Sequence, residues 1–175
     1  MKFTYWETID YYKINKEANT INDKWCDWHN YNDSRKIDCL LKNKKYTLVG
    51  QLQYYLKYMM KECNYSKKII DIKHFEKSLH NSIIIYRGGE GKYKKDFIGT
   101  RKWLSFTAEE NRAYTFSQYQ GTFALKVFKL PENKHYWIIK LSIPLENILL
   151  YYDVNDDEII IDKKEAVKAE LILQE

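Results

Sequence analysis

The chain has 175 residues, of which 45% are hydrophobic and 30% charged, and this composition excludes a largely disordered protein. Its length suits one domain with a core of its own and is short for two, so we expect a single domain over residues 1–175. The net charge of +5 permits a polyanionic partner without requiring one, because the basic runs are short and interrupted.

Cysteine use and hydropathy favour a cytoplasmic protein. Cys26, Cys39 and Cys63 are an odd set with irregular spacing, which does not indicate a disulfide framework. Cys26 and His29 have a metal-like C-x-x-H spacing, but no second pair follows, so no metal site is expected. No signal peptide or membrane-spanning run is recognisable. We therefore expect a protein without membrane contact, in its own cell or in an infected host cell. The sequence leaves the oligomeric state open, with a monomer favoured.

The basic residues are mostly lysine, and only four are arginine: Arg35, Arg87, Arg101 and Arg112. Together with abundant asparagine, isoleucine and tyrosine, this bias is typical of AT-rich coding in a phage, another virus or a low-GC bacterium. Each arginine stands against that bias, so each one merits a physical reason.

Residues 1–80 are predicted to be mainly helical, with loops. Apolar side chains at helical spacing predict an amphipathic helix over Tyr46–Cys63 and a second helix over Ile70–Ser82. The tryptophans of this part are interpreted as packing residues rather than a base-stacking platform, because such platforms usually lie on strands beside basic residues. They are Trp6, Trp25 and Trp28.

Residues 81–175 are predicted to form a mostly antiparallel sheet, because apolar residues there alternate or run continuously. The expected strands are Ser82–Gly88, Lys102–Thr107, Gly121–Leu130, His135–Ile143, Asp157–Asp162 and Ala166–Leu173. One short helix, from Glu109 to about Ser117, interrupts the series. Helices followed by a sheet place the chain in the α+β class.

The motif YRGGEG gathers three of the six glycines of the chain, Gly88, Gly89 and Gly91, beside Arg87. Glycines after a strand let the backbone approach a ligand closely, and a guanidinium there can grip a phosphate with two hydrogen bonds. The alternative is a glycine-rich hairpin turn with an exposed arginine. The motif is neither a P-loop nor a dinucleotide-binding fingerprint.

The stretch WLSFTAEENRAYTF contains a predicted helix start. Thr107 with Glu110 three positions later forms a capping box, which explains Thr107 without a catalytic role. Ser105 is not explained by the cap. It alternates with apolar residues on a short strand, so its hydroxyl points either to solvent or into a polar cleft.

The acidic stretch DVNDDEIIID, which ends at Asp162, begins like an EF-hand calcium loop but has Glu158 where that loop requires glycine, so calcium is disfavoured. Asp156 and Glu158 lie two apart and share a face of an extended chain, which makes them a candidate acid/base pair. The alternative is a solvated turn. Asp153, Asp157 and Asp162 are interpreted as solvated turn residues.

Taken in order, Arg87 in YRGG, Ser105 in SFT and Glu158 in DDEIII resemble the motifs of arginine-serine-glutamate ADP-ribosyltransferases, found in bacterial toxins, phage enzymes and vertebrate ectoenzymes. Their order, spacing and strand placement, with the A-x-x-F helix after SFT, are more specific than any one motif. The resemblance covers roughly residues 40–175. It includes the helix Tyr46–Met59, at the position where the exoenzymes of this family carry a helix over the NAD site.

The resemblance implies a split sheet that encloses an NAD cleft, with NAD as co-substrate and no metal. Arg87 would hold the phosphates, and Ser105 would orient Glu158. Glu158 would bind the ribose 2′-hydroxyl and stabilise the oxocarbenium-like state as nicotinamide leaves. The implied catalytic residues are Glu158, Asp156 and Ser105, and the implied cofactor-binding residues are Arg87, Gly88, Ser105, Thr107 and Glu158.

The chain departs from the family at Asp156, where glutamate or glutamine is usual. In the family, glutamate accompanies arginine acceptors, and glutamine accompanies asparagine, cysteine or nucleobase acceptors. Aspartate reaches one methylene less far, which leaves the acceptor open; its charge favours a guanidinium. Tyr152, or an aromatic residue of the Tyr114–Phe123 region, would contact the target or nicotinamide.

The expected function is mono-ADP-ribosyl transfer from NAD to a macromolecular acceptor, with a protein favoured over a nucleic acid, in a phage, viral or bacterial effector. One alternative is an NAD glycohydrolase, which uses water as acceptor. Another is a binding or inhibitor module that kept the fold and lost catalysis. A basic nucleic-acid-binding domain is supported only by the charge and the many aromatic residues.

Overall fold

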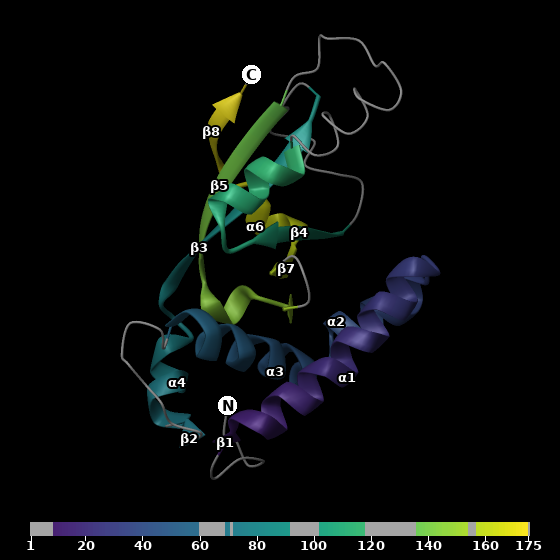
Figure 1. The fold of residues 1–175 in the computed structure, drawn as a ribbon, viewed down its shortest axis with the longest axis vertical. Coiled ribbons are helices and arrows are strands. Elements are labelled where there is room, and N and C mark those ends of the chain that lie inside the picture. Colours follow the sequence, from purple (N-terminus) through teal and green to yellow (C-terminus); the bar gives the residue numbers. More distant parts are fainter. Residues whose placement is uncertain are drawn as a thin grey trace. The chain divides into compact units, whose positions relative to one another are not determined.

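A computed structural model of the chain describes residues 9–59, 69–70, 72–91, 102–117, 136–153 and 157–174. The chain forms two compact units. The first, called the helical unit, comprises Met1–Asn81 and Pro144–Tyr152; the second, called the sheet unit, comprises Ser82–Ile143 and Asp153–Glu175. Helices predominate in the described part of the first and antiparallel strands in that of the second, which confirms the α+β class (Figure 1).

The described part of the helical unit is built from four α-helices and short extended segments (Figure 1). The helices are α1 (Tyr11–Asn30), α2 (Ser34–Leu41), α3 (Lys44–Tyr54) and α4 (Ile72–Ser78). A π-helical turn, η1 (Tyr55–Met59), continues α3, and a 3₁₀ turn, η3 (Leu145–Asn147), precedes strand β6 (Leu150–Tyr152). Strands β1 (Ile9–Asp10) and β2 (Ile69–Ile70) pair antiparallel.

The two helices predicted in this part are found with altered ends. The helix predicted over Tyr46–Cys63 is confirmed to Met59, and its last residues lie outside the described part of the chain. The helix predicted over Ile70–Ser82 is shorter, because Ile70 pairs in β2 and a turn ends the helix after Ser78. The β-branched run that follows this turn favours an extended chain.

Helix α1 was not predicted as a separate element, and its apolar stripe explains it. Ile14, Ala18, Ile21 and Trp25 recur three or four residues apart and are 0–3% exposed, so they form one buried face. The burial of Trp25 confirms it as a packing residue, whereas Trp6 lies outside the described residues.

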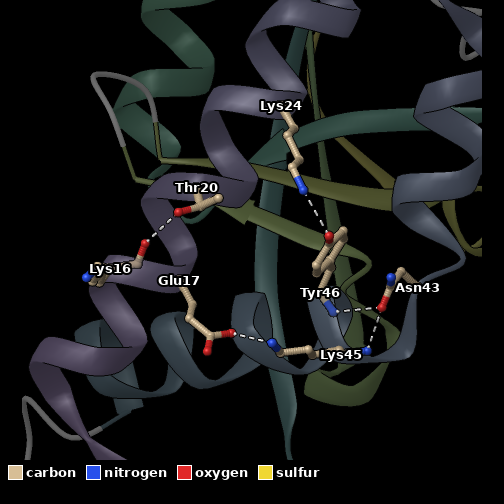
Figure 2. Close-up of polar contacts among 7 residues, drawn as sticks. All are labelled: Lys16, Glu17, Thr20, Lys24, Asn43, Lys45 and Tyr46. Atoms are coloured by element: carbon tan, nitrogen blue, oxygen red, sulfur yellow. Dashed lines mark hydrogen bonds and ion pairs between the residues drawn. The ribbon is translucent and has the colours of Figure 1, made fainter.

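Polar contacts join α1 to the first turn of α3, as Figure 2 shows. Nζ of Lys24 donates to Oη of Tyr46 at 3.0 Å, and Nζ of Lys45 lies 3.0 Å from a carboxylate oxygen of Glu17. The side chain of Asn43 caps α3 by accepting hydrogen bonds from the backbone N–H groups of Lys45 and Tyr46. The cap and the cross-helix contacts therefore act on the same turn.

Gln51 of α3 forms hydrogen bonds with the segment Pro144–Tyr152 of the helical unit. Its Nε2 donates to the carbonyl oxygens of Glu146 at 2.9 Å and Ile148 at 3.0 Å. Replacement by leucine leaves both carbonyls without this donor, so we expect Gln51→Leu to lower the free energy of unfolding by about 2 kcal/mol. Urea denaturation of the full chain measures this loss.

Gln53, two residues further along α3, supplies the matched control. It is as buried as Gln51, at 5% exposure, but its Oε1 has no hydrogen-bond partner among the described residues. Gln53→Leu should therefore cost less than half as much stability as Gln51→Leu. Equal losses in the two variants would show that the two bonds from Gln51 contribute nothing beyond packing.

The described part of the sheet unit contains five strands in the order β7-β4-β3-β5-β8. They are β3 (Ser82–Glu90), β4 (Trp103–Thr107), β5 (Tyr136–Pro144), β7 (Glu158–Asp162) and β8 (Glu170–Gln174). The pairs β3–β4, β4–β7 and β5–β8 are antiparallel. A helix over residues 110–117 follows β4, and α6 (Lys163–Ala166) follows β7.

Four of the six predicted strands are confirmed, with ends shifted by at most two residues from those predicted. The strand predicted over Gly121–Leu130 lies outside the described residues. The strand predicted to begin at Ala166 begins instead at Glu170, because Ala166 ends α6. The carboxylate of Asp162 accepts the backbone N–H of Lys164 at 3.0 Å and starts that short helix. No helix in the described part of the chain is long and apolar enough to span a membrane.

Candidate functional site

A cavity of about 260 Å³ lies in the sheet unit, between β3, β4, β7 and the helix over residues 110–117. Its lining comprises Tyr86, Arg87, Gly88, Ser105, Phe106, Thr107, Ala113, Phe116 and Glu158. Of the predicted catalytic and cofactor-binding residues, all those that the structure describes are in this set. Tyr152, predicted to contact the target or nicotinamide, is not in it; it lies on β6 of the helical unit. Asp156, predicted as catalytic, lies outside the described residues.

Strand register brings three of these residues into one row. Tyr86 of β3 is opposite Thr107 of β4, and Thr107 is in turn opposite Glu158 of β7. Directly opposed residues in antiparallel strands project to the same face, and so do residues two apart on one strand. Ser105 therefore shares the face of Glu158 but lies diagonal to it, opposite Ile160. The hydrogen bond from the Ser105 hydroxyl to Glu158 stays a prediction.

Arg87 is the cationic group of the cavity. Its Nη1 donates to the backbone carbonyl oxygen of Ser105 at 2.6 Å, while its Nε is buried and has no hydrogen-bond partner among the described residues. Burial lowers the pKa of Arg87, and the nearby carboxylate of Glu158 acts in the opposite direction. A buried guanidinium with an unused donor is suited to an anionic ligand.

Asp157, directly before Glu158, is not the solvated turn residue that the sequence predicted. It is 3% exposed, and its carboxylate oxygen lies 3.8 Å from Nε of Arg112 on the helix over residues 110–117. The reason is tertiary, because a residue 45 positions away supplies the opposite charge. Asp153 is exposed as predicted, and Asp162 is half-buried as the cap of α6.

Two glycines of YRGGEG pack closely against other residues of the protein. A Cβ atom on Gly88 would lie 2.0 Å from the carbonyl oxygen of Ala113, and one on Gly89 would lie 2.1 Å from the ring of Trp137. Gly88 thus lines the cavity and also lets the helix over residues 110–117 pack on β3. Gly91 has a φ of 90°, which favours glycine, and a Cβ there would meet nothing within 4 Å.

The predicted capping box is only partly reproduced. The Thr107 hydroxyl accepts the N–H of Glu109 at 3.3 Å, one residue earlier than a capping box requires. Glu110 contributes instead to the electrostatic environment of Tyr86. Burial first, and then the carboxylate of Glu110, raise the pKa of the Tyr86 phenol. Within the described residues, Thr107 therefore caps the start of the helix without the reciprocal contact that a capping box would require.

Sequence reasoning missed Tyr86 and Phe106 as wall residues, and it missed the pairing of Arg112 with Asp157. Phe116 lies within the Tyr114–Phe123 region from which an aromatic contact residue was expected. For Arg112 a signal existed in the rarity of arginine, although its partner could not be read from the sequence. Two residues weighed earlier have other contacts: the thiol of Cys26 donates to Oη of Tyr152 at 3.0 Å, and the ring of His29 stacks on Trp25.

A second cavity, of about 620 Å³, lies in the helical unit between α3, α4 and the segment around Glu146. Apolar side chains of Leu41, Leu48 and Leu79 share its lining with charged ones. None of the described residues predicted individually as catalytic or cofactor-binding lines it, although Thr47, Leu48 and Gln51 belong to the helix that the resemblance places over an NAD site. The smaller cavity is therefore the candidate site.

No protein-family model, curated protein or solved structure matches the chain significantly.

Proposed function

We propose that this protein is a mono-ADP-ribosyltransferase that transfers ADP-ribose from NAD to a macromolecular acceptor and releases nicotinamide. One observation carries the proposal: Arg87, Ser105 and Glu158, which are far apart in the sequence, line one cavity from three neighbouring strands. The motif resemblance concerns the order and spacing of these residues along the chain, whereas their grouping around one cavity depends on the register between strands.

The charges of the cavity complement the two poles of NAD. Its pyrophosphate is anionic and suits the buried guanidinium of Arg87, which keeps Nε available. Its nicotinamide ribose becomes more cationic as the glycosidic bond breaks, and the carboxylate of Glu158 would stabilise that state. A cavity of about 260 Å³ is smaller than a typical ligand pocket of roughly 300–1,000 Å³. It would therefore hold the reacting part of NAD and leave the rest outside.

The proposed reaction breaks the bond between ribose C1′ and the nicotinamide nitrogen, and the bonding electron pair leaves with nicotinamide. A nucleophilic atom of the acceptor then bonds to C1′ and loses its proton. Arg87 holds the phosphates, and Glu158 binds the ribose and faces the developing positive charge. Asp156 is proposed to face the acceptor, where its carboxylate favours a guanidinium group.

Incubation with NAD labelled in its adenylate half, with and without a cytosolic extract, tests the proposal. We expect label on an acceptor macromolecule, one nicotinamide released for each label transferred, and loss of both in Glu158→Gln. Free ADP-ribose without a labelled macromolecule would favour an NAD glycohydrolase. Absence of any NAD cleavage in all extracts would exclude both enzymes and favour a binding module.

A further inference from the structure

Arg112 and Asp157 join the helix over residues 110–117 to the residue directly before Glu158. Nε of Arg112 lies 3.8 Å from Oδ2 of Asp157 and 3.3 Å from Oε2 of Glu109. The side chain of Asp157 is only 4% exposed, whereas that of Arg112 is 37% exposed. Arg112 thus reaches from a partly solvated position to a buried carboxylate. Neither residue has a role in the reaction proposed above.

The backbone of Asp157 adopts a conformation that needs support. Its φ of 48° is in the left-handed region, which few residues other than glycine adopt, although aspartate is among those that tolerate it. Such conformations persist when surrounding contacts enforce them, and a buried carboxylate persists when it is paired. Since Glu158 is the first residue of β7, the conformation of Asp157 sets the direction in which the chain enters that strand.

We propose that the Arg112–Asp157 ion pair positions the carboxylate of Glu158 beside Arg87. This inference rests on the proposed function and adds two positioning residues to it. Arg87 itself is held separately, by its hydrogen bond to the carbonyl oxygen of Ser105. Loss of the ion pair should therefore displace Glu158 while leaving the phosphate-binding group in place, so it should affect bond cleavage more than NAD binding.

The test is a double-mutant cycle with Asp157→Asn and Arg112→Gln in the full chain. Asparagine keeps the size of aspartate and its tolerance of positive φ, but it removes the negative charge and replaces one acceptor oxygen by an NH₂ donor. Each single change should lower kcat roughly 10- to 100-fold, as expected for a catalytic group misplaced by less than about 1 Å. The KM for NAD should stay within about twofold of the wild type.

The double variant should be no slower than the slower single variant, because both changes remove the same interaction. Arg112→Lys should recover part of kcat, since it restores the charge. Glu109→Gln is the matched control, because it removes a second carboxylate that contacts Arg112 and leaves Asp157 in place. Multiplicative losses in the double variant, or an equal loss in Glu109→Gln, would overturn the inference.

Hydrogen exchange of the backbone amides over residues 157–160 tests the pair without any activity. We expect faster exchange in Asp157→Asn and in Arg112→Gln, no further increase in the double variant, and no change in Glu109→Gln. Unchanged exchange in the first two variants overturns the inference, whatever the activity. The variants could show the expected pattern of exchange while the wild-type protein fails to cleave NAD. That result would support the positioning of Glu158 by the ion pair and overturn the proposed reaction.

Discussion

Replacement of Glu158 by glutamine should lower kcat for NAD cleavage about 10²- to 10³-fold, the effect of removing one group that stabilises charge in a transition state. Glutamine keeps the length and polarity of the side chain but removes the negative charge that would face the ribose as nicotinamide leaves. Binding of NAD should weaken little, because Arg87 and its contact with Ser105 are untouched. Rates of nicotinamide release at saturating NAD measure the loss.

Asp162→Asn is the control for this result, because Asp162 stands at the other end of β7. Its carboxylate caps α6, and asparagine caps a helix about as well as aspartate, so stability and rate should both stay near wild type. An equal loss of rate in both variants would assign the effect to the strand as a whole. An active Glu158→Gln variant would remove this carboxylate from the mechanism.

The composition of the site could be predicted from the sequence because its residues lie at the ends of strands with clear apolar patterns. Three consecutive isoleucines indicate strand β7, which begins at Glu158. The YRGG motif follows a continuous apolar run that indicates strand β3. The register between strands could not be predicted, since it depends on pairing between segments about 20 and 50 residues apart along the chain. Hence the residue opposite Glu158 proved to be Thr107, and Ser105 lies diagonal to it.

The parts that sequence reasoning missed depend on tertiary partners or on weak patterns. The apolar stripe of α1 is narrow and interspersed with lysine and asparagine, so the sequence does not mark this segment as a core helix. The burial of Asp157 is invisible locally, because acidic residues before a strand are usually solvated. The approach of Arg112 from another element supplies an opposite charge to this buried carboxylate.

The sequence predicts that the glycines of YRGGEG let the backbone approach a ligand. In the structure, two of them allow close packing within the sheet unit. Gly88 admits the backbone of the helix over residues 110–117, and Gly89 admits the ring of Trp137. The same helix carries Ala113, Phe116 and Arg112, which form the cavity wall and the contact with Asp157. The site therefore depends on a glycine for its architecture as well as on Arg87 for its charge.

Gly88→Ala should lower the free energy of unfolding by at least about 3 kcal/mol, the upper end of the range for overpacking. The new methyl group would lie 2.0 Å from the carbonyl oxygen of Ala113 and 2.9 Å from its carbon. Both atoms belong to helix backbone, which cannot yield as a flexible side chain does. Since 1 kcal/mol corresponds to about 2–4 °C in Tm for a chain of this size, we expect a decrease of about 6–12 °C.

Gly91→Ala separates this steric effect from the general cost of replacing glycine in the same motif. Nothing lies within 4 Å of a Cβ at Gly91, so its cost comes from the φ of 90° alone and should be about 1–2 kcal/mol. Gly88 has no such backbone requirement, and its larger loss must come from the contact with Ala113. If Gly88→Ala proves no more destabilising than Gly91→Ala, the helix over residues 110–117 can move away from β3 at little cost. The cavity wall would then be adjustable, and Arg112 could not hold Asp157 in one place.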